Sequence, residues 1–188
     1  TGVNASIVGV GGGGTRTFQG GSASVDLNYQ NLKLYNQLFP DRKPYDKPYT
    51  MASAATQLRY AVRPYTLFKL YAQYDRTDLI SREGEALRRF DLNEDNLYLN
   101  ATMRHESPAK AWKQFAGVAF SWHRQGIGGV SQLDDHWTLY EQEWHLKVRS
   151  ERSWADGRLG LQAGAEGYLR RYATDYQWAA VNSGDPIY

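Results

Sequence analysis

Glu141, Glu143 and His145 lie at alternate positions of one segment and form the chain's clearest set of side chains that could do chemistry. Alternate residues of a β-strand point to the same face, so these groups could together bind a metal ion or act as an acid/base pair. A hydrated polar face of a sheet would carry the same residues, and we favour that interpretation. We therefore expect no catalytic residue, cofactor or metal site. An enzyme is the class we expect least, because no nucleophile, acid/base group and orienting group converge in the sequence.

The segment Gly9–Gly14 matches the G-x-G-x-x-G pattern of dinucleotide-binding loops. That fingerprint requires a helix directly after the glycines, within a strand–helix–strand unit. Residues 15–21 have no helix signal, and no phosphate-loop lysine follows the glycines. A flexible or bulged strand junction is the favoured interpretation.

Six segments that alternate apolar and polar residues would position the polar groups. Such alternation is typical of β-strands with one apolar face. In one of them Leu97 and Leu99 alternate with Asn96 and Asn100. The predicted strands cover Thr50–Val62, Tyr65–Arg76, Asp95–Arg104, Trp112–Arg124, Trp137–Arg149 and Arg158–Arg170.

The connections between these segments alternate between short and long. The short ones hold Arg63-Pro64, Pro108 and Asp156-Gly157, which are residues typical of tight turns. The long ones run from Pro40 to Pro48, from Ile80 to Leu92 and from Gly126 to Asp135. Outer-membrane barrels sort their connections in this way, with short periplasmic turns and longer extracellular loops. We assign the two sets to those sides.

The first 40 residues are less regular. A strand is expected over Val3–Val10, followed by the glycine run, and Thr15–Phe18 could resume it. After a turn at Gln19–Gly21 we expect a long strand over Ser22–Phe39, with a bulge near Gln30-Asn31 that keeps its apolar residues on one face. These two strands bring the total to about eight. Both ends of the chain look like cuts within a longer polypeptide, so residues 1–188 are expected to be a single segment of a barrel.

Composition excludes several classes of protein. The 188 residues contain no cysteine, carry a net charge of +2 and have no basic run, so a disulfide framework and a nucleic-acid partner are not expected. No stretch approaches the roughly 20 apolar residues of a membrane-spanning helix. Aromatic residues make up 14% of the chain, an excess that girdles of Tyr and Trp at two membrane interfaces would use.

These patterns together predict an all-β fold: an antiparallel, up-and-down transmembrane β-barrel in a bacterial outer membrane. Strands of 13 residues are longer than most strands of soluble proteins, and backbone groups in lipid must all pair, so the sheet has to close. Eight strands could close alone or form part of a larger wall, which we favour. A soluble ligand-binding β-barrel remains the alternative, because alternation does not reveal whether lipid or a protein core meets the apolar face.

The barrel interpretation assigns two sets of side chains to membrane lipid and to the lumen. The candidate lumen-facing polar residues are Arg104, His123, Glu141, Glu143, His145 and Glu166. The candidate membrane-interface aromatic residues are Tyr60, Tyr74, Trp112, Trp122, Tyr140 and Trp144.

Several strand-like phrases resemble barrel strands of TonB-dependent outer-membrane receptors. They are Gly21–Leu32 continuing to Phe39-Pro40, Leu67–Tyr74, and Phe90–Leu92 followed by Asn96–Ala101, and the resemblance covers roughly residues 20–172. It implies a 22-stranded barrel closed by a plug domain. Such receptors import a nutrient, for example an iron chelate, cobalamin or a glycan, with energy supplied by TonB. The chain has no recognisable plug or TonB box, so the resemblance implies a piece of the barrel wall and carries over no substrate residue.

We therefore expect the barrel wall of an outer-membrane transport receptor for a small molecule or glycan, with TonB and a plug domain as partners in the full protein. A plug-less channel or a barrel that sheathes a partner protein would have the same sequence pattern.

Overall fold

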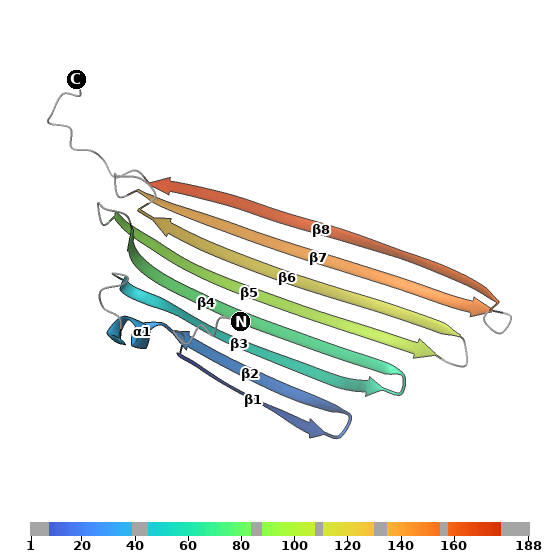
Figure 1. The fold of residues 1–188 in the computed structure, drawn as a ribbon. Helices are drawn as coiled ribbons and strands as arrows, with labels where there is room; N and C mark the ends of the chain where they lie inside the picture. Colours follow the sequence, from blue (N-terminus) through green and yellow to red (C-terminus); the bar gives the residue numbers. More distant parts are fainter. Residues whose placement is uncertain are drawn as a thin grey trace.

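One antiparallel sheet contains nearly all of the structure that the computed structural model describes, which covers residues 8–38, 45–83, 88–107, 111–129, 135–154 and 158–177. Its eight strands follow the chain order without a crossover (Figure 1). They are β1 (Val8–Phe18), β2 (Gly21–Asn31), β3 (Tyr45–Arg63), β4 (Thr66–Glu83), β5 (Arg88–Ser107), β6 (Trp112–Gly128), β7 (His136–Trp154) and β8 (Leu159–Gln177). The helix α1 (Lys33–Leu38) lies between β2 and β3. The prediction of an all-β, up-and-down fold is confirmed.

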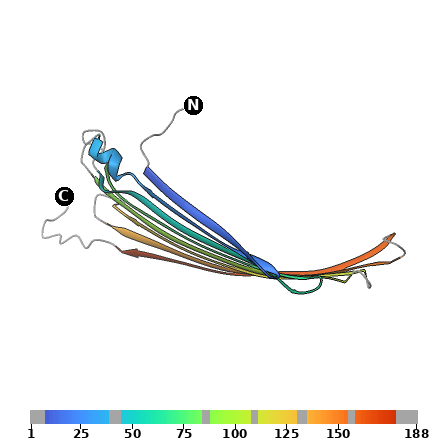
Figure 2. The ribbon, with the colours of Figure 1, turned by 90° about the horizontal axis from the view of Figure 1, so that it is seen from below.

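The sheet is open. β1 and β8 are its two edges, and no pairing joins them. Figure 2 shows the strands bending together in one shallow curve, with no second layer of described residues packed on either face. We call the end with the β1–β2, β3–β4, β5–β6 and β7–β8 connections the turn end, and the opposite end the loop end.

The strands are longer than the alternation predicted. β3 to β8 each contain 17 to 20 residues, so 19 residues extend over roughly 63 Å at about 3.3 Å each. Most of the predicted loop at Ile80–Leu92 is strand: β4 continues to Glu83, and β5 begins at Arg88. Four residues therefore separate β4 and β5, no more than separate β5 and β6. The predicted alternation of short and long connections holds for the β2–β3 and β6–β7 connections but not for this one.

The segment after β2 is also different from the prediction. The expected strand over Ser22–Phe39 ends at Asn31, without the predicted bulge, and α1 follows. The Asn31 side-chain oxygen accepts a hydrogen bond from the Lys33 backbone N–H at 2.5 Å, a local bond that turns the chain out of the strand. In β1, the glycine run lies inside one continuous strand rather than after it, and most of the predicted strand Val3–Val10 lies outside the described residues.

The register places like residues in common rows across the sheet. Pairing is continuous between neighbouring strands of the described sheet, apart from register irregularities near the two ends of the β3–β4 pair. Residues directly opposite one another lie on the same face. Tyr74, for example, is opposite Leu97, and Leu97 is opposite Trp122. The alternating faces predicted for the individual strands therefore become two continuous faces, one apolar and one polar.

The apolar face carries an exposed band of hydrophobic side chains. No hydrophobic residue is buried in the described part of the chain, and Leu146 and Leu169 are 57% and 70% exposed. Other exposed members of the band are Val25, Leu27, Leu70, Leu99, Met103, Val118, Trp144, Val148 and Leu161. In β1, Arg16 interrupts it, opposite Ala23. A monomer in water rarely leaves so large a contiguous apolar surface uncovered, so either lipid or further protein must cover this face.

The loop-end border of this band runs obliquely across the sheet. On each strand we take the first polar residue beyond the band, namely Asn31, Thr50, Arg76, Asp95, Arg124, Gln142 and Arg171 on β2 to β8. On β2 and β3 this residue lies in the same register row as Asp78 of β4. On β7 and β8 it lies in the same row as Tyr74 of β4. The border therefore shifts by four residues towards the turn end over six strand steps. With strands about 4.8 Å apart and residues about 3.3 Å apart, this corresponds to a tilt of about 25°.

Aromatic residues near the turn end shift in the same direction. Phe18, Tyr60 and Phe68 share one row on β1, β3 and β4. Trp112 of β6 lies four residues beyond the member of that row on its strand, Ala116, and Trp154 of β7 lies six residues beyond Val148. The outermost aromatic residues near the turn end thus shift across the register rows in the same sense as the loop-end border.

Gly21 allows a close approach at the first turn. A Cβ at this position would lie 2.3 Å from the Arg59 carbonyl oxygen and 2.9 Å from the Phe18 ring, which stacks on Tyr60 with ring centroids 6.2 Å apart. Nothing would lie within 4 Å of a Cβ at Gly14. The two glycines therefore form a matched pair for a test of packing.

We predict that Gly21→Ala lowers the free energy of unfolding by about 1–3 kcal/mol, because the backbone of β3 must move to admit the methyl group. Gly14→Ala is expected to change it by no more than about 0.5 kcal/mol. Urea unfolding of the protein in detergent micelles, followed by tryptophan fluorescence, measures both values. Equal effects of the two substitutions would show that the close approach at Gly21 does not constrain the sheet.

Candidate functional site

The polar face of the sheet holds all six residues predicted to face a lumen. Arg104 lies on β5, His123 on β6, Glu141, Glu143 and His145 on β7, and Glu166 on β8, and the register places them on one face. They do not form one cluster. Glu166 and His145 interact near the middle of the strands, Glu141 and Glu143 lie nearer the loop end, and Arg104 lies near the turn end.

Glu166 is the centre of the densest polar contacts on this face. Its carboxylate lies 2.7 Å from His145 Nε2 and accepts hydrogen bonds from Lys147 Nζ at 3.0 Å and from the Tyr168 hydroxyl at 2.7 Å. The His145 and Tyr168 rings stack with centroids 4.3 Å apart. These contacts tie β7 to β8 and leave the Glu166 carboxylate neutralised by its neighbours.

Two further groups connect strands towards the loop end. Arg170 of β8 forms an ion pair with Glu141 and approaches Glu143 at 3.9 Å. His123 of β6 lies 2.6 Å from the Asn96 side-chain oxygen and 3.7 Å from Glu94 on β5. The alternate acidic residues of β7 thus share an arginine. Within the described ranges, no group of three or more His, Asp or Glu side chains could hold a metal ion.

Charges on the polar face separate along the strands. The half near the turn end carries six cationic and three acidic side chains, an excess of three positive charges: Arg59, Lys69, Arg104, Lys113, Lys147 and Arg149 against Glu106, Glu151 and Glu166. Among the side chains that the structure describes, the half near the loop end carries five acidic groups and one cation: Asp26, Asp75, Glu94, Glu141 and Glu143 against Arg170. A row without formal charge, from Ser24 to Tyr168, divides the two halves.

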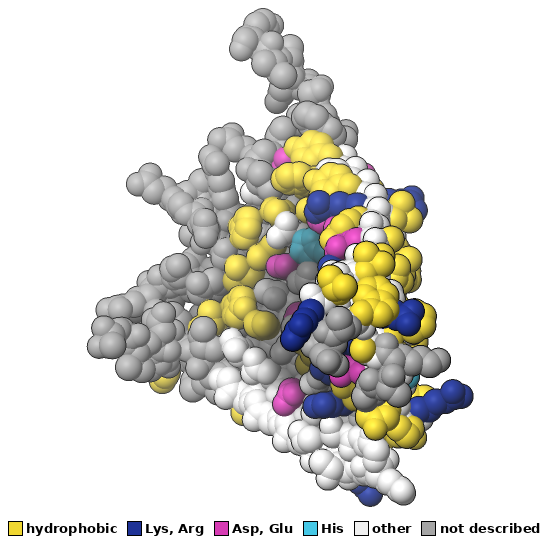
Figure 3. All heavy atoms as spheres, turned by 90° about the vertical axis from the view of Figure 1, so that its right-hand side faces the viewer, with side chains coloured by type: hydrophobic (Ala, Val, Ile, Leu, Met, Phe, Trp, Pro, Cys, Tyr) yellow, Lys and Arg dark blue, Asp and Glu magenta, His cyan; other side chains and the backbone are white. Residues whose placement is uncertain are grey.

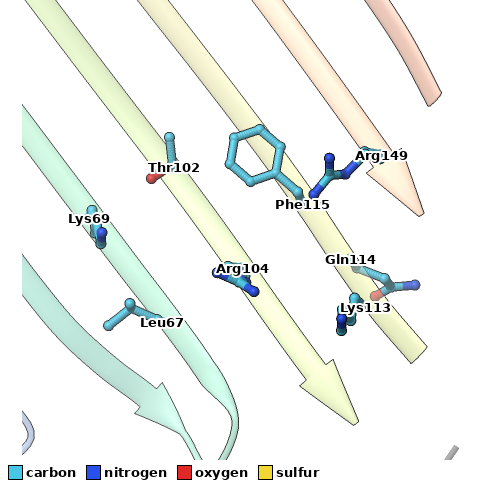
Figure 4. A pocket seen from close by; sticks show the side chains of 8 residues that line it. All are labelled: Leu67, Lys69, Thr102, Arg104, Lys113, Gln114, Phe115 and Arg149. Atoms are coloured by element: carbon cyan, nitrogen blue, oxygen red, sulfur yellow. The ribbon is translucent and has the colours of Figure 1, made fainter. Parts of the chain in front are cut away.

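A hollow of about 320 Å³ lies in the positive half (Figure 4). We call it the basic hollow. Leu67, Lys69, Thr102, Arg104, Lys113, Gln114, Phe115 and Arg149 line it, so its cations come from four consecutive strands. Figure 3 looks at the molecule from the turn end, where blue Lys and Arg side chains lie among yellow hydrophobic ones.

The loop end of the polar face finishes in an apolar row. Leu79, Leu92, Ile127, Trp137 and Tyr176 lie opposite one another on β4 to β8. The Tyr176 hydroxyl donates a hydrogen bond to Asp135, which is only 4% exposed. This bond raises the pKa of Tyr176, which lies seven residues beyond Leu169 and outside the apolar band.

The six aromatic residues predicted at membrane interfaces all lie on the apolar face. Tyr60 and Trp112 are near its turn-end border, and Tyr74, Trp122 and Trp144 are the last band residues before the loop-end border. Tyr140 lies beyond that border, where the Arg124 guanidinium is 5.8 Å from its ring centroid. Trp112 donates a hydrogen bond to the Ser150 hydroxyl at 2.6 Å. Five of the six therefore lie near one or the other border of the band.

Comparison with known protein families, with curated proteins and with solved structures finds no match. None of the helices among the described residues is long and apolar enough to cross a membrane.

The sequence reading missed the basic hollow. Its cations are scattered over residues 69–149 and form no run. The sequence contains one indication that cations gather at this end of the sheet: Arg104, Lys113 and Arg149 all lie within a few residues of the predicted short turns. Only the register shows that they share a face.

We predict that Arg170→Glu lowers the urea midpoint, because it places a third carboxylate beside Glu141 and Glu143. Glu141→Arg in the same chain should recover most of the loss. Arg171→Glu, the same change one residue away on the other face, is the matched control and should have the smaller effect. The loss should shrink in 0.5 M salt, which screens exposed charges. Equal midpoints for the two single variants would show that the Arg170 ion pair contributes nothing to stability.

Proposed function

We propose that this chain forms part of the wall of a transmembrane β-barrel in a bacterial outer membrane, in a receptor that imports a small molecule or glycan. The apolar face would meet lipid, and the polar face would line the interior. The turn end would face the periplasm and the loop end the outside.

The oblique border of the apolar band carries this proposal. A planar slab of lipid cuts tilted strands at a different register position on each strand, so its borders must run across the rows. The loop-end border of the band does so and gives a tilt of about 25°, approaching the 35–45° of barrel strands, and the outermost aromatic residues near the turn end shift in the same sense. From Phe68 to Tyr74 on β4 and from Leu159 to Leu169 on β8, the band covers roughly 20–33 Å along the strands, which brackets the ~25 Å apolar belt of outer-membrane barrels.

The open edges support a barrel larger than eight strands. Each of β1 and β8 leaves one row of backbone N–H and C=O groups without a strand partner in the described sheet. Such groups must pair in lipid, where no water replaces the missing bonds. In a membrane, the shallow curve of Figure 2 would therefore continue through further strands.

The polar face supports a role in transport. It is ion-paired and hydrogen-bonded across every strand boundary from β5 to β8, as a surface in contact with water would be. Together with the barrel-strand phrases of the sequence, it favours a receptor whose import is energised by TonB, with a plug domain inside the barrel.

Neighbouring positions on β6 test the membrane contact. Val118 belongs to the apolar band and Ala119 to the polar face, and the chain contains no native cysteine. We predict that a nitroxide at Val118→Cys collides with dissolved oxygen, which concentrates in lipid, and is shielded from a water-soluble nickel chelate. A nitroxide at Ala119→Cys should show the opposite preference. Electron paramagnetic resonance of the protein in lipid vesicles measures both.

Depth measurements in the same vesicles provide the control for the tilt. Tyr60 and Ala165 share one register row, but Tyr60 lies near the turn-end border of the band, whereas Leu159 and Leu161 extend the band beyond Ala165. A label at Ala165→Cys should therefore be deeper in the bilayer than one at Tyr60→Cys. Nickel access at Val118→Cys equal to that at Ala119→Cys would contradict the membrane proposal.

Uptake by cells tests the receptor role. We predict that cells without this protein lose uptake of one labelled nutrient among ferric chelates, cobalamin and oligosaccharides. Cells that have the protein but lack TonB should lose the same uptake, because the energy source is missing. Normal uptake of every candidate in both strains would contradict import through this protein, and a loss in the first strain alone would indicate a passive channel.

A further inference from the structure

We propose that the basic hollow is a binding site for a small multivalent oxyanion, a molecule with two or more phosphate or carboxylate groups. The site is the place where Lys69, Arg104, Lys113 and Arg149 converge from β4, β5, β6 and β7. The inference rests on the charges of the polar face and not on what covers the apolar face.

The register explains why four cations share one hollow. Arg104 of β5 lies opposite Phe115 of β6, and Phe115 lies opposite Arg149 of β7, so the two arginines share one row with Phe115 between them. Lys69 lies in the next row, opposite Thr102. Figure 4 shows these side chains around the hollow, with Thr102 offering a hydroxyl donor. Three strand spacings, about 14 Å, separate β4 from β7, which suits a ligand with more than one anionic group.

The chain neutralises only part of this charge. Glu106 pairs with Arg104, and Glu151 lies 3.9 Å from Lys113. In the described ranges, no ion pair is formed by Lys69 or Arg149. Arg59 makes the imbalance greater, because it lies directly opposite Lys69 on β3, and like charges directly opposite one another destabilise a sheet.

The rest of the polar face restricts an anion to this hollow. The half near the loop end has an excess of four negative charges and repels oxyanions, whereas the positive half supplies guanidinium groups that bind carboxylate or phosphate through two parallel hydrogen bonds. An excess of three positive charges is not matched by a single chloride ion. A ligand with several charged oxygens would neutralise it at one place.

Isothermal titration of the protein in detergent micelles with inorganic pyrophosphate and with citrate tests the site, at an ionic strength held constant with sodium chloride. We expect saturable binding of at least one of the two, and their relative affinities distinguish a phosphate from a carboxylate site. Arg149→Gln and Lys69→Gln should each weaken binding about tenfold, because each removes a charge-assisted hydrogen bond. Lys69→Arg should retain binding.

Arg171→Gln, which removes one positive charge from the other face, is the matched control and should leave the affinity unchanged. Circular dichroism of each variant shows whether it retains the sheet. The proposal is overturned if neither oxyanion binds to the native protein above the chloride background. It is also overturned if Arg171→Gln weakens binding as much as Arg149→Gln, or if only an acidic peptide such as oligoglutamate binds, which would identify the hollow as a contact for a protein segment.

Discussion

The pairing of backbone groups between neighbouring strands is the constraint on which the rest of this structure depends. The described residues contain no buried hydrophobic side chain, so no core fixes the sheet from within. Seven antiparallel pairings hold the strands in register. Because side chains alternate with a period of two, a slip of one residue in any pairing would move a whole strand's apolar residues to the polar face. Both faces exist only because every register is kept.

Because the register is kept, the alternation patterns of the eight strands combine into two continuous faces. Each face has its own orientation relative to the register rows. The apolar band runs obliquely to the rows, whereas the charge boundary on the polar face follows a single row from Ser24 to Tyr168. The two faces therefore respond to different surroundings. The apolar border follows the plane of whatever covers that face, whereas the two charged zones follow one another along the strand axis.

The sequence predicted the parts of the fold that depend on alternation alone. Each of the six strands after Thr50 was located, and the residues assigned to its two faces lie on those faces, because period two is a direct product of the pleat. Strand ends were predicted less well. The charge-rich segment from Ile80 to Leu92 was predicted as a loop, yet long strands continue through polar segments when both flanking partners extend as far. The helix at Lys33–Leu38 was missed because its leucines also fit a bulged strand. The hydrogen bond that the Asn31 side chain accepts from the Lys33 backbone N–H favours the helix.

The candidate site, like the fold, could be predicted only in part from the sequence. The shared face of Glu141, Glu143 and His145 could be predicted from their spacing within one strand. The partners of these residues could not, because Arg170 and Glu166 belong to β8 and are brought opposite β7 only by the register of that pair. The basic hollow depends on three such registers at once.

The glycine run of β1 has a mechanical consequence. Gly9 and Gly11 to Gly14 leave this edge strand with little more than its backbone at five of its 11 residues, so few side chains hold it to β2. Glycine also regains the most conformational freedom when a strand is released. A force that peels the sheet from its edges would therefore detach β1 long before β8, whose contacts through Glu166 and Arg170 resist shear. The weakest pairing of the sheet is therefore expected at its β1 edge.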